Sequence, residues 1–130
     1  MFDLSKKTDY GMELMVALAK NYPKGTLSLK EIAKDKKLPL KFLEQIAGQL
    51  RDACLIEAKE GKGGGYFLND KPKNISVAEI VAVLEGADMF AGCAGCAKAG
   101  LCSHEEVWQE VKGAVQSTME DKSLADLIKK

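Results

Sequence analysis

The residues with the clearest chemistry are three cysteines within one ten-residue stretch, Cys93, Cys96 and Cys102. Thiolates at such close spacing, among Gly and Ala residues, can bend around a metal without backbone strain. Three thiolates and one further ligand hold an iron–sulfur cluster, whereas three thiolates and a histidine hold zinc. His104, the only histidine, lies two positions after Cys102. The pattern predicts a cluster or a zinc site on these four residues, with small or free thiols as the structural alternative.

The fourth cysteine, Cys54, stands alone near the end of a predicted helix, and we expect a buried structural thiol there. In a reducing compartment, clustered cysteines indicate metal binding or redox chemistry rather than a disulfide framework. The first residues lack the pattern of a signal peptide, and no apolar run approaches the roughly 18–20 residues that span a bilayer. We therefore expect a cytoplasmic protein that does not associate with membranes.

The elements that must position this chemistry begin with a helix from Ser5, which the Pro- and Gly-containing residues 21–25 end. A second, short helix is predicted after Ser28, because Ser28 and Glu31 have the spacing of a capping box. A turn at residues 36–38 follows this helix. Two short helices joined by a tight turn would form a helix-turn-helix.

The third predicted helix begins at Pro39, because the first helical position loses no hydrogen bond to proline. A helix fits the major groove of B-DNA and presents its solvent face to base edges. Lys41, Gln45 and Gln49 suit contacts with bases, and Arg51 suits phosphates. An ordinary helical hairpin with a solvated polar face is the structural alternative.

A Gly-rich connector at residues 60–64 joins two strand-like runs, residues 55–59 and 65–69, and predicts a hairpin. A hairpin directly after a helix-turn-helix is typical of a winged helix, and Lys59 and Lys62 flank its tip. A nucleotide-binding loop would need a helix after the glycines, where a strand-like run follows instead. The predicted DNA-contacting residues are Ser28, Pro39, Lys41, Glu44, Gln45, Gln49, Arg51, Lys59 and Lys62.

Three further helical segments are predicted after the hairpin. A capping box at Ser76 and Glu79 starts the first of them, and Gly86 ends it. The cysteine-bearing residues 87–101 are predicted to form a loop. A longer helix follows to about residue 120, and a last short helical segment covers residues 123–130.

The long helix is predicted to start at a third capping box, Ser103 with Glu106, and it carries one apolar seam. A small wing domain cannot easily cover this seam, so we expect pairing with a second copy to bury it. Packing against the chain's own first helix is the alternative. The predicted dimerisation residues are Val107, Trp108, Val111, Ala114, Val115 and Thr118.

Net charge is zero, but the charges are unevenly distributed. Up to Ile75 there are fourteen Lys and Arg against ten Asp and Glu, and beyond it five against nine. Such asymmetry suits a chain that binds a polyanion with one half and associates with itself through the other, although ordinary scatter is the alternative. The predicted fold is mainly α with a small β-hairpin wing. A winged helix-turn-helix DNA-binding domain spans 1–75, and a cluster-binding loop and long dimerisation helix span 76–130, in one compact chain.

Several stretches resemble the IscR/NsrR-type winged-helix transcriptional regulators of bacteria, over nearly the whole chain. They are Thr8-Asp9-Tyr10-Gly11, Phe42-Leu43-Glu44-Gln45-Ile46, Gly63-Gly64-Gly65-Tyr66, the cysteine triplet and Leu124-Ala125-Asp126-Leu127. The resemblance implies a homodimer that holds an iron–sulfur cluster, 2Fe-2S or 4Fe-4S, near the dimer interface. It also implies that DNA affinity changes with iron supply, cluster status, nitric oxide or redox stress.

Two departures from that family pattern bear on the site. The first cysteine gap is shorter than in IscR, and His104 follows the last cysteine by two positions instead of three, which puts His104 in doubt as fourth ligand. Asp9 lies in a stretch resembling nitric-oxide-sensing relatives, in which an aspartate of the partner subunit is the fourth ligand. Asp9 is therefore the predicted ligand, and its structural alternative is an acid that stabilises a helix start. In the wing, Glu60 replaces a frequent Arg, so either the two wing lysines compensate or the wing contributes little.

The sequence thus predicts a homodimeric regulator of transcription that binds double-stranded DNA and is not an enzyme. The alternative is a winged-helix regulator that uses zinc or thiol oxidation without a cluster. A small redox or electron-transfer protein fits less well, because no substrate-pocket pattern or catalytic carboxylate pair accompanies the single histidine.

Overall fold

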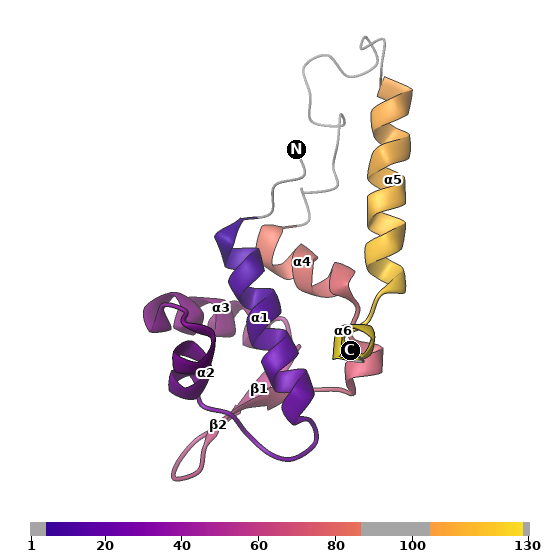
Figure 1. Cartoon of the computed structure of the whole chain (residues 1–130). Helices are drawn as coiled ribbons and strands as arrows, with labels where there is room; N and C mark the ends of the chain where they lie inside the picture. Colours follow the sequence, from indigo (N-terminus) through magenta and orange to yellow (C-terminus); the bar gives the residue numbers. More distant parts are fainter. Residues whose placement is uncertain (1–4, 87–104, 129–130) are drawn as a thin grey trace.

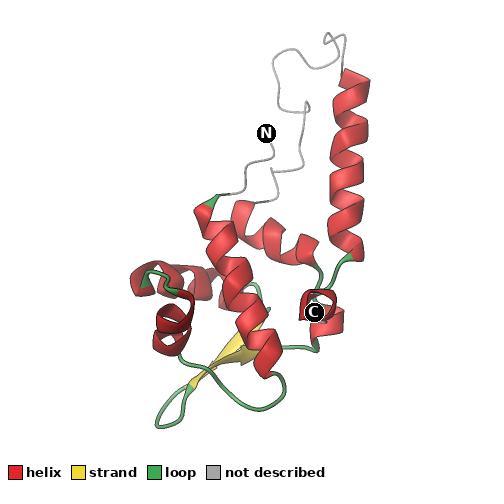
Figure 2. Ribbon diagram, in the orientation of Figure 1, coloured by secondary structure: helices red, strands yellow, loops and turns green. Residues whose placement is uncertain are grey.

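The computed structural model describes residues 5–86 and 105–128 (Figure 1). These residues are mainly helical, with one two-stranded hairpin (Figure 2), so the predicted fold class is confirmed. In chain order the elements are α1 (Lys6–Asn21), α2 (Leu29–Lys36), α3 (Leu40–Asp52), β1 (Ile56–Lys59), β2 (Gly65–Leu68), the 3₁₀ turn η1 (Pro72–Asn74), α4 (Val77–Glu85), α5 (Glu105–Asp121) and α6 (Leu124–Ile128). The predicted loop at residues 87–101 and the predicted cap at Ser103 lie outside the described residues.

Helix α1 is the central element, because it packs against α3, α4, α6 and β2. It begins at Lys6, one residue after the predicted start, because Ser5 is the N-cap, whose Oγ accepts a hydrogen bond from the backbone N–H of Thr8 at 3.3 Å. It ends at Asn21, and Tyr22 is extended, as a residue before proline usually is. Its buried residues are Thr8, Gly11, Leu14, Met15, Leu18 and Ala19.

Helices α2 and α3 form the predicted helix-turn-helix. Ser28 Oγ accepts a hydrogen bond from the backbone N–H of Glu31 at 3.1 Å, which fixes the start of α2. After α2, Lys37 adopts the left-handed conformation with φ of 57°, and its N–H closes the helix on the Ala33 carbonyl. Pro39 is the N-cap of α3 and not its first helical residue, because its ψ of 122° is extended. The predicted start was therefore one residue early.

The hairpin pairs β1 with β2 in antiparallel register, with Ile56 opposite Leu68. Each strand is one residue shorter than predicted. Leu55 lies in the connection between α3 and β1, where its N–H donates to the Leu50 carbonyl at 3.0 Å. A further strand-like contact, between Leu27 and β2, was not predicted.

Helix α4 begins and ends at the predicted residues. Ser76 Oγ accepts a hydrogen bond from the N–H of Glu79 at 3.1 Å, and Gly86 leaves the helix with φ of 93°. Helix α5 packs against α4, and in Figure 1 its first turns extend past α4.

Helix α6 returns to the body of the molecule and packs against α1 and η1. Leu124 is fully buried, and its N–H donates to the Ile75 carbonyl at 3.0 Å. The described part of α6 ends at Ile128, and the last two residues of the predicted segment lie outside the described residues. The buried side chains form one core between these elements, which includes Leu14, Met15, Leu18, Leu43, Ile46, Leu50, Ile56, Ile80, Leu84 and Leu124.

Candidate nucleic-acid interface

Helix α3 has one buried face and one exposed face. The buried residues are Leu43, Ile46, Ala47 and Leu50, as predicted. The exposed residues include Lys41, Glu44, Gln45, Gln49 and Arg51. Amide, ammonium and guanidinium groups on one exposed helix face can pair with base edges and phosphates. All five predicted contact residues of α3 are thus accessible on one element that a DNA groove could admit.

Two contacts from α1 hold α3 in place. Tyr10 meets Phe42 edge-on, with ring centroids 5.5 Å apart and planes at 80°. Gly11 lies between α3 and α4, where a Cβ would overlap Leu84 Cδ1 and come within 3.3 Å of Ile46 Cγ2. Helix α1 can therefore approach both neighbours only because residue 11 has no side chain.

The turn before α3 presents lysines, while Ser28 serves mainly as a cap. Ser28 is half-buried and its hydroxyl already accepts a hydrogen bond from the start of α2. Lys36 Nζ lies 3.7 Å from a Glu13 carboxylate oxygen, whereas Lys37 and Pro39 are exposed. Lys37 is thus the lysine of this turn that a phosphate would reach first.

The tip of the wing carries charges of both signs. Lys62 is exposed between Gly61 and Gly63, whose φ values of 95° and 78° favour glycine. Glu60 is exposed two residues earlier. At this tip Lys62 carries the charge that attracts a phosphate, and Glu60 carries one that repels it.

Lys59 lies at the base of the tip and not at its end. It is exposed on the last residue of β1, and it lines a hollow of about 250 Å³ together with Tyr22 and Phe67. The two predicted wing lysines therefore occupy different places, which allows their contributions to be separated by substitution.

A polar network joins the start of α1 to the end of α4. Glu85 Oε1 accepts hydrogen bonds from the backbone N–H of Ser5 and from the hydroxyl of Thr8, both at 2.8 Å. These bonds, the Ser5 N–H first, lower the pKa of Glu85 because they favour its charged form. Thr8 is fully buried, although the next residue, Asp9, is exposed.

The sequence analysis missed Thr8 and Glu85 as a pair. A signal for Thr8 was available, because it lies three positions before Gly11 and seven before Met15, on the buried stripe of α1. A polar residue on such a stripe needs a hydrogen-bond partner. No local pattern indicates that the partner is Glu85, which is far away along the chain.

The predicted metal ligands are mostly beyond the described structure. Cys93, Cys96, Cys102 and His104 lie outside the described residues. Within residues 5–86 and 105–128, no three His, Cys, Asp or Glu side chains are grouped as a metal site. Asp9 is described, and it is next to Thr8, which bonds to Glu85 at the start of the cysteine-bearing segment.

Comparison with known proteins identifies the class of molecule that this geometry serves. A family model, Rrf2, described as an iron-dependent transcriptional regulator, matches residues 4–130. The chain belongs to the Rrf2 family. It is 33% identical to the transcriptional regulator CymR of Bacillus subtilis over 124 aligned residues. The aligned stretch covers 95% of this chain and 88% of CymR.

Solved structures of Rrf2 proteins agree with the fold. The structure of B. subtilis CymR, titled the global cysteine regulator, matches with a TM-score of 0.88 at 33% identity, covering 98% of this chain and 96% of CymR. The structure of T. potens IscR matches with a TM-score of 0.84 at 34% identity, covering 98% and 87%. The chain is therefore a DNA-binding transcriptional regulator and not an enzyme, and the predicted family resemblance is confirmed.

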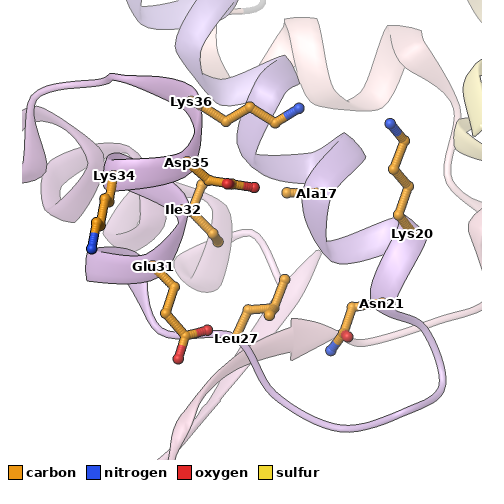
Figure 3. A pocket seen from close by; sticks show the side chains of 9 residues that line it. All are labelled: Ala17, Lys20, Asn21, Leu27, Glu31, Ile32, Lys34, Asp35 and Lys36. Carbon is orange, nitrogen blue, oxygen red and sulfur yellow. The ribbon is translucent and has the colours of Figure 1, made fainter.

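One cleft among the described residues is lined mainly by polar and charged side chains. It lies between α1 and α2 with a volume of about 740 Å³, and Figure 3 shows charged side-chain ends around Ala17. Its lining residues are Ala17, Lys20, Asn21, Leu27, Glu31, Ile32, Lys34, Asp35 and Lys36. None of the described helices is long and apolar enough to cross a membrane.

Cys54 corrects one prediction, because it is exposed and not buried. It follows the last turn of α3 in the left-handed conformation, with φ of 64°, and its N–H donates to the Arg51 carbonyl at 2.9 Å. The chain reverses there on its way from α3 to β1, so residue 54 lies on the outside of the reversal. The prediction rested on the usual burial of a lone thiol, and the exposed reversal after α3 overrides that tendency.

Helix α5 leaves much of its predicted seam exposed in the single chain. Its main neighbour is α4 and not α1. Val107 and Trp108 are 53% and 38% exposed, Ala114 and Thr118 are exposed, and Val111 and Val115 are half-buried. Single exposed apolar side chains are ordinary on a protein surface, but apolar side chains that gather into a continuous patch mark an interaction site.

Proposed function

We propose that this Rrf2 protein is a homodimeric regulator that senses iron–sulfur cluster status, iron, nitric oxide or redox state through Cys93, Cys96 and Cys102. One observation carries the proposal: a triplet of cysteines in the segment between α4 and α5 of an Rrf2 chain. Free thiolates of this kind persist in a reducing compartment, so the proposed location is the bacterial cytoplasm.

The chemistry of the donor set fits a cluster. Three thiolates can bind iron, and a bound cluster would supply a group that gains or loses electrons or reacts with nitric oxide. A carboxylate is a weaker fourth ligand for iron than a thiolate, and its displacement would let a signal reach the centre. The exposed carboxylate of Asp9, at the end of α1 that is bonded to Glu85, is the candidate.

Absorption spectra of anaerobically purified protein test the cluster. We expect a brown protein with iron and sulfide, and loss of colour in Cys96→Ala without loss of helix content. Cys54→Ala is the matched control, because Cys54 is exposed and belongs to another part of the chain. Colourless protein that carries zinc would exclude the cluster and leave the DNA-binding assignment standing.

Two substitutions identify the fourth ligand. Asp9→Ala should shift the absorption spectrum and speed cluster loss, whereas His104→Ala should leave both unchanged. The reverse result would assign the ligand to His104. If neither substitution changes the spectrum, the fourth ligand is another group.

The proposed reading face is the exposed side of α3, with Lys41, Glu44, Gln45 and Gln49 near base edges and Arg51 near phosphate. A side chain that pairs with a base sets sequence preference, whereas a phosphate contact changes affinity for every sequence. Gln45→Ala should therefore change the preferred DNA sequence, and Lys62→Ala should weaken binding to all sequences. Unchanged preference in Gln45→Ala would exclude Gln45 as a reading residue.

The exposed seam of α5 supports a homodimer. Trp108→Glu should convert the protein to a monomer in size-exclusion chromatography with light scattering, because a charge would be buried in the interface. Ser117→Glu is the matched control, since residue 117 is exposed and lies nine positions on, half a turn round the helix. A monomeric wild type, or a dimeric Trp108→Glu protein, would contradict this assignment.

A second candidate is a regulator that senses through zinc or thiol oxidation without a cluster. It is favoured by the likeness to CymR, whose structure is titled that of the global cysteine regulator of B. subtilis. In that case metal analysis would find zinc or no metal, and DNA affinity would respond to a thiol oxidant in the wild type but not in Cys96→Ala.

A further inference from the structure

The wing is tied to the connector that joins α1 to α2. Leu27 pairs with Tyr66 of β2 through both backbone hydrogen bonds, with N–O distances of 3.0 and 2.8 Å. Beside this pair, Thr26 Oγ1 donates to the Gly63 carbonyl at 2.8 Å. Gly65 permits the close approach, because a Cβ there would overlap the Leu27 carbonyl oxygen. The hairpin is thus held at β2 by backbone bonds and at its tip by one side chain.

The tip needs a fixed orientation because its two exposed charges have opposite signs. Glu60 and Lys62 are two positions apart, and phosphates attract an ammonium but repel a carboxylate. Gly61 and Gly63 make the backbone at the tip permissive. If the tip could turn freely, either Glu60 or Lys62 could face the DNA. A bond that holds the tip in one orientation, such as that from Thr26 to Gly63, would therefore favour one of the two charges.

We propose that Thr26 is a positioning residue for DNA binding, whose hydrogen bond to Gly63 holds the wing tip so that Lys62 faces the DNA backbone and Glu60 does not. Thr26 is half-buried in the connector and acts through Lys62 without touching DNA itself. The inference rests on the proposed contact between the wing and DNA. It explains how a wing with an acid at its tip still adds to affinity.

Thr26→Val tests this role, because valine keeps the shape of threonine and removes the donor. DNA affinity measured by fluorescence anisotropy should fall by roughly threefold to tenfold, the effect of losing one net hydrogen bond. Thr26→Ser should restore wild-type affinity, because it keeps the hydroxyl. Hydrogen exchange of the Gly64 amide, which donates to the Gly61 carbonyl inside the tip, should speed up in Thr26→Val.

Combined substitutions identify the groups through which Thr26 acts. Thr26→Val should add no loss of affinity in a Glu60→Ala/Lys62→Ala background, because both charges that the tip presents are already absent. It should keep its full effect in a Lys59→Ala background, since Lys59 lies at the base of the tip. Lys62→Ala should also lower the slope of log affinity against log salt by about 0.9 for each lost phosphate contact.

The outcomes separate this inference from the function on which it rests. If Lys62→Ala binds DNA like the wild type, the proposed wing contact fails. If Lys62→Ala weakens binding but Thr26→Val does not, the contact stands and the positioning role is overturned. If Thr26→Val weakens binding equally in the Glu60→Ala/Lys62→Ala background, Thr26 does not act through the charges of the tip, and the positioning role is again overturned.

Discussion

Gly11 and Gly48 offer the same substitution at two helical positions with opposite surroundings. A Cβ at Gly11 would overlap Leu84 Cδ1 and lie 3.3 Å from Ile46 Cγ2, and both of these side chains are buried. A Cβ at Gly48, in the middle of α3, would meet nothing within 4 Å. We therefore expect Gly11→Ala to destabilise the protein relative to Gly48→Ala.

The size of the difference follows from two effects. Replacing Gly by Ala inside a helix lowers the free energy of the folded state by about 1 kcal/mol at either position. Overpacking a core costs about 1–3 kcal/mol, and only Gly11→Ala incurs it. The helix effect cancels in the comparison, so Gly48→Ala should exceed Gly11→Ala in unfolding free energy by about 1–3 kcal/mol.

Urea unfolding of both variants and the wild type, at one protein concentration, measures this difference. A fixed concentration is needed because dimer formation would contribute to stability. In thermal unfolding the two variants should differ by roughly 4–12 °C, at about 4 °C per kcal/mol for a chain of this size. Equal stabilisation by both substitutions would show that α1 does not approach α4 as closely as described.

Three further substitutions test other parts of the fold. Glu85→Gln keeps the acceptor for Ser5 and Thr8 but loses the charge. Since the pKa of Glu85 is lowered in the folded protein, its charge stabilises the fold above the unfolded pKa, and this gain is lost as pH falls through the folded pKa. In urea titrations the wild type should therefore be more stable than Glu85→Gln at pH 7, and the difference should shrink as the solution is acidified. Leu124→Ala should cost about 2–5 kcal/mol in unfolding free energy, because this fully buried side chain anchors α6 to the core. Asp9→Ala should change unfolding free energy of metal-free protein by less than about 1 kcal/mol, the usual effect of an acid at a helix start.

The sequence analysis succeeded where local signals were strong. The predicted caps at Ser28 and Ser76 place two helix starts correctly, because a hydroxyl three positions before an orphan N–H is a local arrangement. The start of α3 was predicted one residue early at Pro39. A proline at the N-cap and a proline at the first helical position have similar φ, and they differ in ψ, which is extended here. The prediction also failed at Cys54, where the end of α3 is decided by a chain reversal and not by a periodic pattern.

The contacts that hold the candidate interface were not predictable in the same way. The tie between Thr26 and the wing joins residues 37 positions apart, and the Leu27–Tyr66 pair is a single bridge without an alternating run. The bond from Thr8 to Glu85 spans 77 positions. Each depends on the packing of α1 or the hairpin against another element, which periodicity within one segment does not encode.

The Thr8-Asp9-Tyr10-Gly11 run shows how structure divides a family motif into parts. Thr8 is buried on a hydrogen bond to Glu85, Tyr10 packs against Phe42, and Gly11 leaves room for Leu84. The packing of the fold therefore explains the residue types at these three positions. Asp9 is exposed, and the structure gives its side chain no hydrogen bond or ion pair within the described residues. The fold therefore does not use the carboxylate of Asp9, which is accessible to a metal. The contacts of Thr8, Tyr10 and Gly11 hold in place the helical turn that carries this proposed ligand.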